Sequence, residues 1–166
     1  DVARRFFESD TGQIVVNGPA REISVNTPNT VAMTTQGTEM KTGVLSVEGA
    51  NVPATYAISS LDGKPLAESR RMLMWVLTDA ANKGMSFEDA ERTTLRNLGT
   101  FPPEIQPIRV RLNLATKQAA NLKTWALSLS GERRELVTST ADAGSLNIRI
   151  DSRLLKRGPA IFYEIA

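Results

Sequence analysis

The sequence YAISSLDGKPLAESRRMLMWVLT, residues 56–78, decides the fold that the rest of the chain supports. It begins with a β-type run over Tyr56–Ser59, turns at Asp62-Gly63 with Pro65 close behind, and returns as an unbroken apolar run over Met72–Leu77. Gly accepts a positive φ and Pro cannot continue a strand ladder, so the middle is a turn. Because the returning run is apolar at every position, we expect it to be buried on both faces, as a central strand is. This stretch predicts the middle hairpin of an all-β domain.

Other segments carry the pattern of short strands separated by Gly, Pro and Asn. Strands are predicted over residues 13–17, 22–26, 30–35, 43–48, 108–114, 124–129, 135–139, 146–150 and 160–165. Alternation predicts that Ile23 and Val25 point inward in the second of these strands and that Trp125 points inward in the sixth. No helix of a dozen residues separates the strands, as a parallel α/β fold requires. The predicted fold is an antiparallel β-sandwich of jelly-roll type.

Residues 79–106 are predicted to be one long irregular excursion from this sandwich. Residues 80–84 resemble a turn, and residues 86–97 either begin a helix capped by Ser86 or cross one end of the sandwich as irregular chain. The sequence Phe101-Pro102-Pro103 enforces an extended backbone. Residues 10–166 are expected to form a single domain. Residues 1–9 are either a linker from a preceding domain or an edge segment that packs its two Phe side chains onto the sandwich.

The amino-acid composition excludes several kinds of functional site and argues against several classes of protein. The 166 residues contain no Cys and no His, which removes disulfides, thiol nucleophiles, Cys-based metal sites and the usual general base. A net charge of +2 gives little support for a nucleic-acid partner. No run approaches the roughly 18 apolar residues that a membrane span needs. The chain begins at Asp1 without Met or a signal-like segment, so we expect a piece of a longer protein.

No motif of catalysis or metal binding is present, and we do not expect an enzyme. Three acidic pairs have the composition that a glycosidase needs, but each lies in or beside a predicted turn, where Asp and Glu are common for backbone reasons. These pairs are Asp62 with Glu68, Asp79 with Glu88, and Asp142 with Asp151. The loop carboxylates leave a structural Ca²⁺ site open, but their spacing matches no known motif, so no cofactor is predicted.

Aromatic side chains are the first candidates for binding, because sugars are commonly held by an aromatic face with flanking polar groups. Tyr56, Phe87 and Phe101 lie at a strand start or in the excursion and are the best placed to be exposed. Trp75 and Trp125 are also candidates, although each lies in an apolar pattern typical of the core.

Arginine side chains are the second candidates. Arg109, Arg111 and Arg149 alternate with apolar residues and are predicted to form a basic stripe on an outer sheet face. Such a stripe is either a solvated face or a contact with an acidic glycan or a neighbouring domain.

A family resemblance adds a function to this interpretation. The stretches that carry it follow one another along nearly the whole chain: ESDTGQI (8–14), VNTPNTVAMTTQG (25–37), SSLDGKPLAESRRMLM (59–74), DAANKGM (79–85), TWALSLSGER (124–133) and FYEIA (162–166). Together they resemble the C-terminal β-sandwich domain that follows the catalytic barrel in certain bacterial glycoside hydrolases of the β-galactosidase, agarase and cellulase-like kind. The segment SLDGKPLAESRR is the most specific of them.

The resemblance implies a non-catalytic accessory domain of a secreted or periplasmic polysaccharide-degrading enzyme. The catalytic carboxylates of such enzymes lie on the barrel, so none transfers to this chain. One function that follows is a carbohydrate-binding module that keeps the enzyme on its polysaccharide. An alternative is a structural domain that braces the catalytic barrel without binding sugar, and a more remote one is a small stand-alone glycan hydrolase or lyase. Two or more aromatic rings on one exposed face would favour binding, whereas their burial beside an apolar N-terminal patch would favour bracing.

Overall fold

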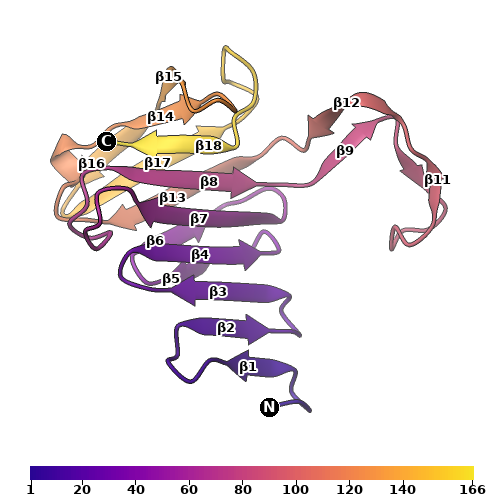
Figure 1. Ribbon diagram of the computed structural model, residues 1–166, viewed down its shortest axis with the longest axis horizontal. Helices are drawn as coiled ribbons and strands as arrows, with labels where there is room; N and C mark the ends of the chain where they lie inside the picture. Colours follow the sequence, from indigo (N-terminus) through magenta and orange to yellow (C-terminus); the bar gives the residue numbers. More distant parts are fainter.

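The computed structural model describes all 166 residues as an antiparallel β-sandwich, which confirms the predicted all-β fold class (Figure 1). A nine-stranded sheet and a five-stranded sheet pack face to face, and the C-terminal strand lies inside the larger sheet between β8 and β14. The only helical segment is a short 3₁₀ turn, η1 (Ala119–Asn121). No helix has the length and apolar character needed to cross a membrane.

The order of the strands across each sheet departs from their order along the chain. From edge to edge, the nine-stranded sheet contains β1 (Phe6–Glu8), β2 (Ile14–Asn17), β3 (Glu22–Asn26), β4 (Thr30–Thr35), β7 (Ala54–Ser60), β8 (Met72–Leu77), β18 (Phe162–Ile165), β14 (Thr124–Leu127) and β15 (Arg133–Val137). The five-stranded sheet contains β16 (Ser139–Asp142), β17 (Ser145–Asp151), β13 (Arg109–Ala115), β6 (Leu45–Glu48) and β5 (Met40–Thr42). Two further pairs lie outside both sheets: β9 (Ala80–Lys83) with β12 (Thr100–Ile105), and β10 (Ser86–Phe87) with β11 (Leu95–Asn97).

The central hairpin is confirmed, because β7 pairs with β8 and the second strand has the predicted bounds. Its turn is held by the Asp62 carboxylate, which accepts hydrogen bonds from the hydroxyls of Ser60 and Ser69 and from the backbone N–H groups of Lys64 and Arg70. These bonds hold the pKa of the Asp62 carboxyl well below its usual range. The turn is held further by Asn29, whose side-chain amide donates to the carbonyl oxygens of Gly63 and Lys64.

Burial of β8 differs from the prediction on one of its faces. Met72, Met74 and Val76 are buried in the core between the sheets, as expected. Leu73 and Trp75 point to the opposite face and are only half-buried, because nothing in this chain covers that side of the sheet. The apolar run therefore belongs to a strand with one face in the core and one face open.

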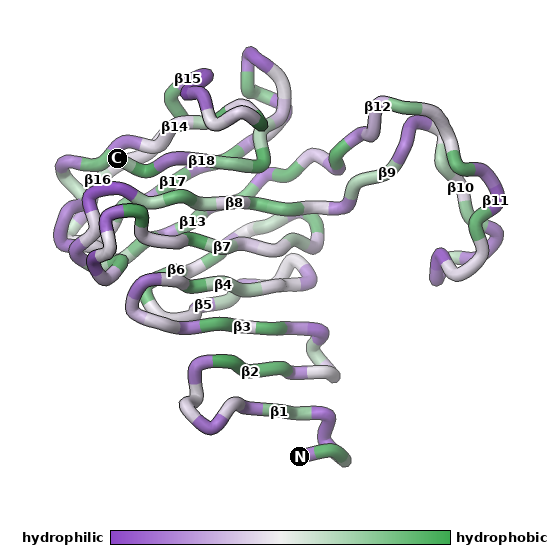
Figure 2. The backbone as a smooth tube through the Cα atoms, in the orientation of Figure 1, coloured by the Kyte–Doolittle hydropathy of each residue, from purple (hydrophilic) through white to green (hydrophobic).

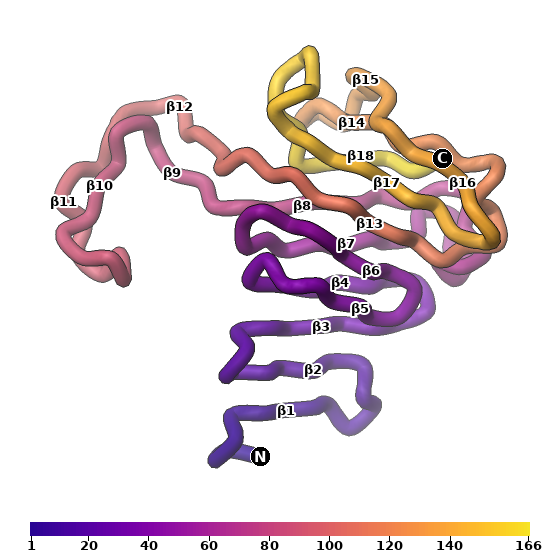
Figure 3. The backbone as a smooth tube through the Cα atoms, turned by 180° about the vertical axis from the view of Figure 1, so that it is seen from behind, coloured from indigo at the N-terminus to yellow at the C-terminus, as the bar shows by residue number.

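The strands β1 and β2 extend the larger sheet beyond the edge of the smaller one (Figures 1 and 3). Their apolar residues consequently lack a facing layer, and Figure 2 shows hydrophobic segments in β2 and β3 at this end of the sheet. The predicted inward orientation of Ile23 and Val25 is wrong, since both lie on the outer face and Ile23 is 47% exposed. Phe6 and Phe7 are also exposed and do not pack onto the sandwich.

Residues 79–106 form an arm that projects from the end of β8 (Figure 1). The predicted turn at residues 80–84 is wrong, because β9 pairs with β12 there, and residues 86–97 contain no helix. Instead the Asp89 carboxylate accepts hydrogen bonds from the backbone N–H groups of Thr93 and Thr94 and closes the tip as a tight loop. The extended chain predicted at Phe101-Pro102-Pro103 is confirmed as part of β12.

Two tyrosines of the core have no exposed surface but differ in hydrogen bonding. The Tyr163 hydroxyl donates to the carbonyl oxygen of Ala160 at 3.0 Å, whereas the Tyr56 hydroxyl has no partner. Burial raises the pKa of Tyr56 to about 12 and also raises that of Tyr163. Burying a hydroxyl without a partner costs free energy, so these two side chains should respond oppositely to loss of the oxygen.

We expect Tyr56→Phe to raise the free energy of unfolding by about 1 kcal/mol and Tyr163→Phe to lower it by about 1 kcal/mol, as measured by urea unfolding at pH 7. A raised folded-state pKa also means that stability is lost as the pH rises above the unfolded value of 10.0 toward 12. Tyr56→Phe should therefore lose less stability over that range than the unmodified protein. Equal destabilisation by both substitutions would contradict the absence of a partner at Tyr56.

Candidate functional site

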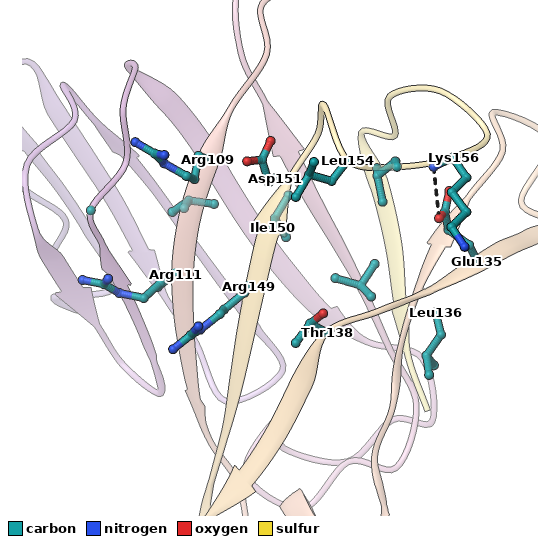
Figure 4. A pocket seen from close by; sticks show the side chains of 14 residues that line it. Arg109, Arg111, Glu135, Leu136, Thr138, Arg149, Ile150, Asp151, Leu154 and Lys156 are labelled. Carbon is teal, nitrogen blue, oxygen red and sulfur yellow. Dashed lines mark hydrogen bonds between the residues drawn. The ribbon is translucent and has the colours of Figure 1, made fainter.

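A groove of about 590 Å³ lies at the outer side of the five-stranded sheet, where β13 and β17 pass beside the chain that runs from β15 to β16. Figure 4 shows Arg109, Arg111 and Arg149 extending from neighbouring strands toward one side, with Glu135 and Lys156 on the other. Leu136 and Leu154 add apolar surface to the lining. The groove is thus bordered by cationic side chains on one wall and by a mixed wall opposite.

The floor of this surface is built by the register of β13 and β17. Strand alternation sends Val110, Leu112 and Leu114 into the core, so the residues between them face outward. Three rungs of directly opposed side chains result on the outer face. These rungs are Arg109 with Asp151, Arg111 with Arg149, and Asn113 with Asn147.

The side chains of each rung lie close together. The Arg149 N–H donates to the Thr138 carbonyl, away from β13, and the Arg109 carbonyl accepts from the Asn51 N–H, away from β17. Opposed residues whose backbone groups point away from each other form the closer kind of antiparallel pair, with Cα atoms about 4.5 Å apart. The amide rung shows this proximity directly, because Asn113 Nδ2 donates to Asn147 Oδ1 at 2.8 Å.

The positive charge on this face is only partly neutralised. Arg111 Nε lies 3.8 Å from Glu48 Oε2, longer than the 2.7–2.9 Å typical of a charge-assisted hydrogen bond. The guanidinium groups of Arg109 and Arg149 make no ion pair and no hydrogen bond within the chain. The surface therefore presents unsatisfied donors and positive charge to solvent.

The opposite wall is fixed by a carboxylate. Glu135 on β15 accepts hydrogen bonds from the backbone N–H groups of Lys156 and Arg157, at 3.2 and 3.1 Å. These bonds anchor the loop between β17 and β18 against the larger sheet, so that Lys156 lies on the wall opposite the arginines. The groove is consequently shaped by backbone hydrogen bonding and not by flexible side chains alone.

The structure brings together only the arginines among the predicted binding residues. Arg109 and Arg111 lie in the groove with Arg149, which places the predicted basic stripe on an outer sheet face. The exposure predicted for Tyr56 is wrong, since its side chain lies in the core. Phe87 and Phe101 lie on the arm, and Phe101 is 85% exposed.

The tryptophans occupy a different surface from the one predicted. Trp75 and Trp125 lie on the outer face of the nine-stranded sheet, half-buried, and not in the core. In β14 the residues that face the core are Thr124 and Ala126, which pair with the inward-facing Ile165 and Tyr163. The guanidinium carbon of Arg133 lies 5.2 Å from the centre of the Trp125 ring and covers it.

This outer face carries an apolar row that runs across six neighbouring strands. Cross-strand pairing places one residue of each strand in the row: Ile14, Val25, Ala32, Ala57, Trp75 and Phe162. On the C-terminal side the row is flanked by Glu164, whose carboxylate accepts from Arg71 Nε at 2.7 Å and from Arg133 Nε at 2.6 Å. These two bonds hold the pKa of the Glu164 carboxyl below its usual value despite its burial. The outer face of the larger sheet thus carries one apolar row, which lies between hydrogen-bonded Thr and Ser pairs of β4 and β7, and one satisfied charge cluster.

Sequence reasoning missed the amide rung and the backbone groups around the arginines. Asn113 follows Arg111 by two positions and Asn147 precedes Arg149 by two, so the same alternation places all four on one face. That spacing could have predicted that the two amides lie on the same face as the arginines. The role of Thr138 had no such signal, because its carbonyl reaches Arg149 only through the pairing of β16 with β17.

The groove offers hydrogen-bond donors and positive charge, and no three His, Cys, Asp or Glu side chains in the chain converge to hold a metal ion. Comparison of the chain with models of protein families, with curated proteins and with solved structures finds no match.

Proposed function

We propose that this protein is a non-catalytic accessory domain of a secreted or periplasmic polysaccharide-degrading glycoside hydrolase, and that it binds polysaccharide along the groove beside β13 and β17. The resemblance of the stretches around SLDGKPLAESRR to such domains supports the context. The observation that carries the binding function is the set of three polar rungs on one sheet face, next to a groove of about 590 Å³.

The groove suits a glycan because of the groups that it presents. Sugar hydroxyls need hydrogen-bond donors and acceptors at fixed positions, and a sheet supplies them at a regular spacing of about 7 Å for every second residue. Asn113 and Asn147 provide amide groups, and the arginines provide donors that the chain itself does not use. Apolar contact with Leu154 and Leu136 is available to the carbon faces of a sugar ring.

The groove is a stronger candidate than the arm. Phe101 is the most exposed aromatic residue, but it lines none of the five main depressions of the surface. The Phe87 ring is already covered by Arg92, whose guanidinium carbon lies 4.7 Å from the ring centre. The arm therefore presents one exposed ring outside the main depressions, whereas the groove combines apolar and polar groups in one depression.

Affinity electrophoresis against a panel of soluble neutral and acidic polysaccharides is expected to show retardation of the protein by at least one of them. Replacement of the amide rung in Asn113→Ala/Asn147→Ala should weaken that binding by about tenfold, because each lost hydrogen bond to a ligand contributes roughly 1 kcal/mol. Phe101→Ala is the matched control on the arm and should leave retardation unchanged. Loss of binding in Phe101→Ala alone would place the site on the arm, and retardation by no glycan would contradict the function.

A second function, bracing of a neighbouring catalytic domain, is favoured by the apolar row on the nine-stranded sheet. Ile14, Trp75 and Phe162 belong to this row, and Leu77 and Phe7 add further exposed apolar surface on the same face. Contiguous apolar surface of this kind is typical of a protein interface. Binding at the smaller sheet and bracing through the larger one use opposite faces and are compatible.

Bracing predicts that Trp75 and Trp125 become protected when the domain is part of its whole native polypeptide. Acrylamide quenching of tryptophan fluorescence should be clearly weaker at these two residues in that polypeptide than in the 166-residue chain alone. Trp75→Phe and Trp125→Phe variants assign the signal to each residue and correct for tryptophans elsewhere. Equal accessibility in both forms would show that this face stays open, and bracing would then be excluded for it.

A further inference from the structure

We propose that the glycan bound in the groove is acidic, and that Arg111 and Arg149 together bind one carboxylate or sulfate group of it. This inference rests on the proposed binding function and names the ligand chemistry of the same site. The juxtaposition that carries it is a pair of directly opposed arginines with no acid between them.

Two arginines at opposed positions repel each other. Arginine stays protonated at all physiological pH values, and like charges directly opposite on neighbouring strands destabilise a sheet. The Arg111–Arg149 pair is of the closer kind, because the backbone N–H of Arg149 points to Thr138 on the far side. An anion placed between the two guanidinium groups would turn this repulsion into two attractions.

The protein does not supply that anion. Arg149 has no ion pair, and the carboxylate nearest to Arg111 is that of Glu48 on the next strand, at 3.8 Å. Asp151 lies opposite Arg109, on the neighbouring rung, and Glu48 lies opposite Arg111 on the side away from Arg149. Three arginines on two adjacent strands therefore face two acids, and neither acid lies between Arg111 and Arg149.

The nine-stranded sheet contains a comparable pair of arginines whose charge is neutralised by a carboxylate of the chain. Arg71 and Arg133 approach Glu164 from two sides, and each Nε lies within 2.7 Å of a carboxylate oxygen. There the anion belongs to the chain itself, and it is nearly buried. Between Arg111 and Arg149 the corresponding position is open.

A small depression marks that position. It measures about 140 Å³ and is lined by Arg111, Arg149, Asn113, Asn147 and Glu48 among others. It adjoins the larger groove, with which it shares both arginines. A carboxylate or sulfate group fits such a depression while the sugar that carries it lies in the groove, and the amides of the next rung are within reach of its hydroxyls.

Arginine is also suited to this ligand by its shape. A planar guanidinium donates two parallel hydrogen bonds to a carboxylate or sulfate, which fixes the direction of the anion as well as its charge. The two sources of the charge, a uronic acid and a sulfate ester, share this geometry and are distinguished by experiment.

Calorimetric titration with matched pairs of glycans tests the inference. The pairs are polygalacturonate with its methyl-esterified form, and a sulfated galactan with the same galactan after desulfation. We expect at least one charged member to bind about tenfold or more tightly than its neutral partner, since a hydrogen bond between charged groups is roughly worth that factor or more. The pair that shows the difference identifies carboxylate or sulfate.

The variant Arg149→Gln should lose about tenfold or more in affinity for the charged glycan and little for the neutral one. Its thermal unfolding midpoint should stay equal or rise, because the substitution removes a like-charge opposition. Arg96→Gln is the matched control, since Arg96 lies on the arm away from the groove, and it should change neither quantity.

The remaining outcomes separate this inference from the function on which it rests. Equal binding of charged and neutral glycans, or full retention by Arg149→Gln, would overturn the acidic ligand while leaving glycan binding in place. Equal losses in Arg149→Gln and Arg96→Gln, or equal competition by double-stranded DNA, would show unspecific attraction of polyanions and overturn the site. Binding of no glycan at all would overturn both proposals.

Discussion

Burial of one face of β8 against the smaller sheet is the constraint on which the rest of this structure depends. Met72, Met74 and Val76 form the middle of the core, and β8 is flanked by β7, its hairpin partner, and by β18, the last strand of the chain. The core therefore closes only when residues almost ninety positions apart pair with each other, as Phe162 and Trp75 do. Pairing of this kind joins distant parts of the chain within one sheet, and such non-local contacts slow folding.

The same alternation creates two outer faces of opposite chemistry. On the larger sheet one cross-strand row of outward residues from β2 to β18 is apolar, whereas on the smaller sheet Arg109, Arg111 and Asn113 of β13 face outward with Asn147, Arg149 and Asp151 of β17. Apolar residues on an outer face lower the free energy only if something else covers them. Polar residues on the other face favour a hydrated ligand. The bracing and the glycan binding that we propose would each use the face whose chemistry suits it.

Sequence patterns predicted strands reliably where one face is clearly apolar. The alternation of Val110, Leu112 and Leu114 fixed which face of β13 is outward and hence placed Arg109 and Arg111 correctly. The same reasoning failed for Trp75, because a strand that is apolar on both sides gives no signal for which side meets the core. For Trp125 the alternation indicated the wrong face, since Thr124 and Ala126 face the core and the register shifts between Ala126 and Leu127. It failed for the arm as well, since β9 is a strand only through its pairing with β12, twenty residues later. The register that opposes Arg111 to Arg149 has no local signal at all.

The two arginine pairs differ in whether the chain itself neutralises their positive charge. Around Glu164 the guanidinium groups satisfy a carboxylate that would otherwise be buried without a partner, so the cluster is complete without a ligand. Around Arg111 and Arg149 the cationic side chains outnumber the acidic ones. Because both arginines are exposed, water weakens the repulsion between their guanidinium groups but does not remove it. The core beneath them is filled by Leu112 and Ile148 on the opposite face of the sheet, so the core does not require two arginines at these positions. Like charges at directly opposed positions cost stability, and this cost is the reason for our proposal that the pair binds an anion.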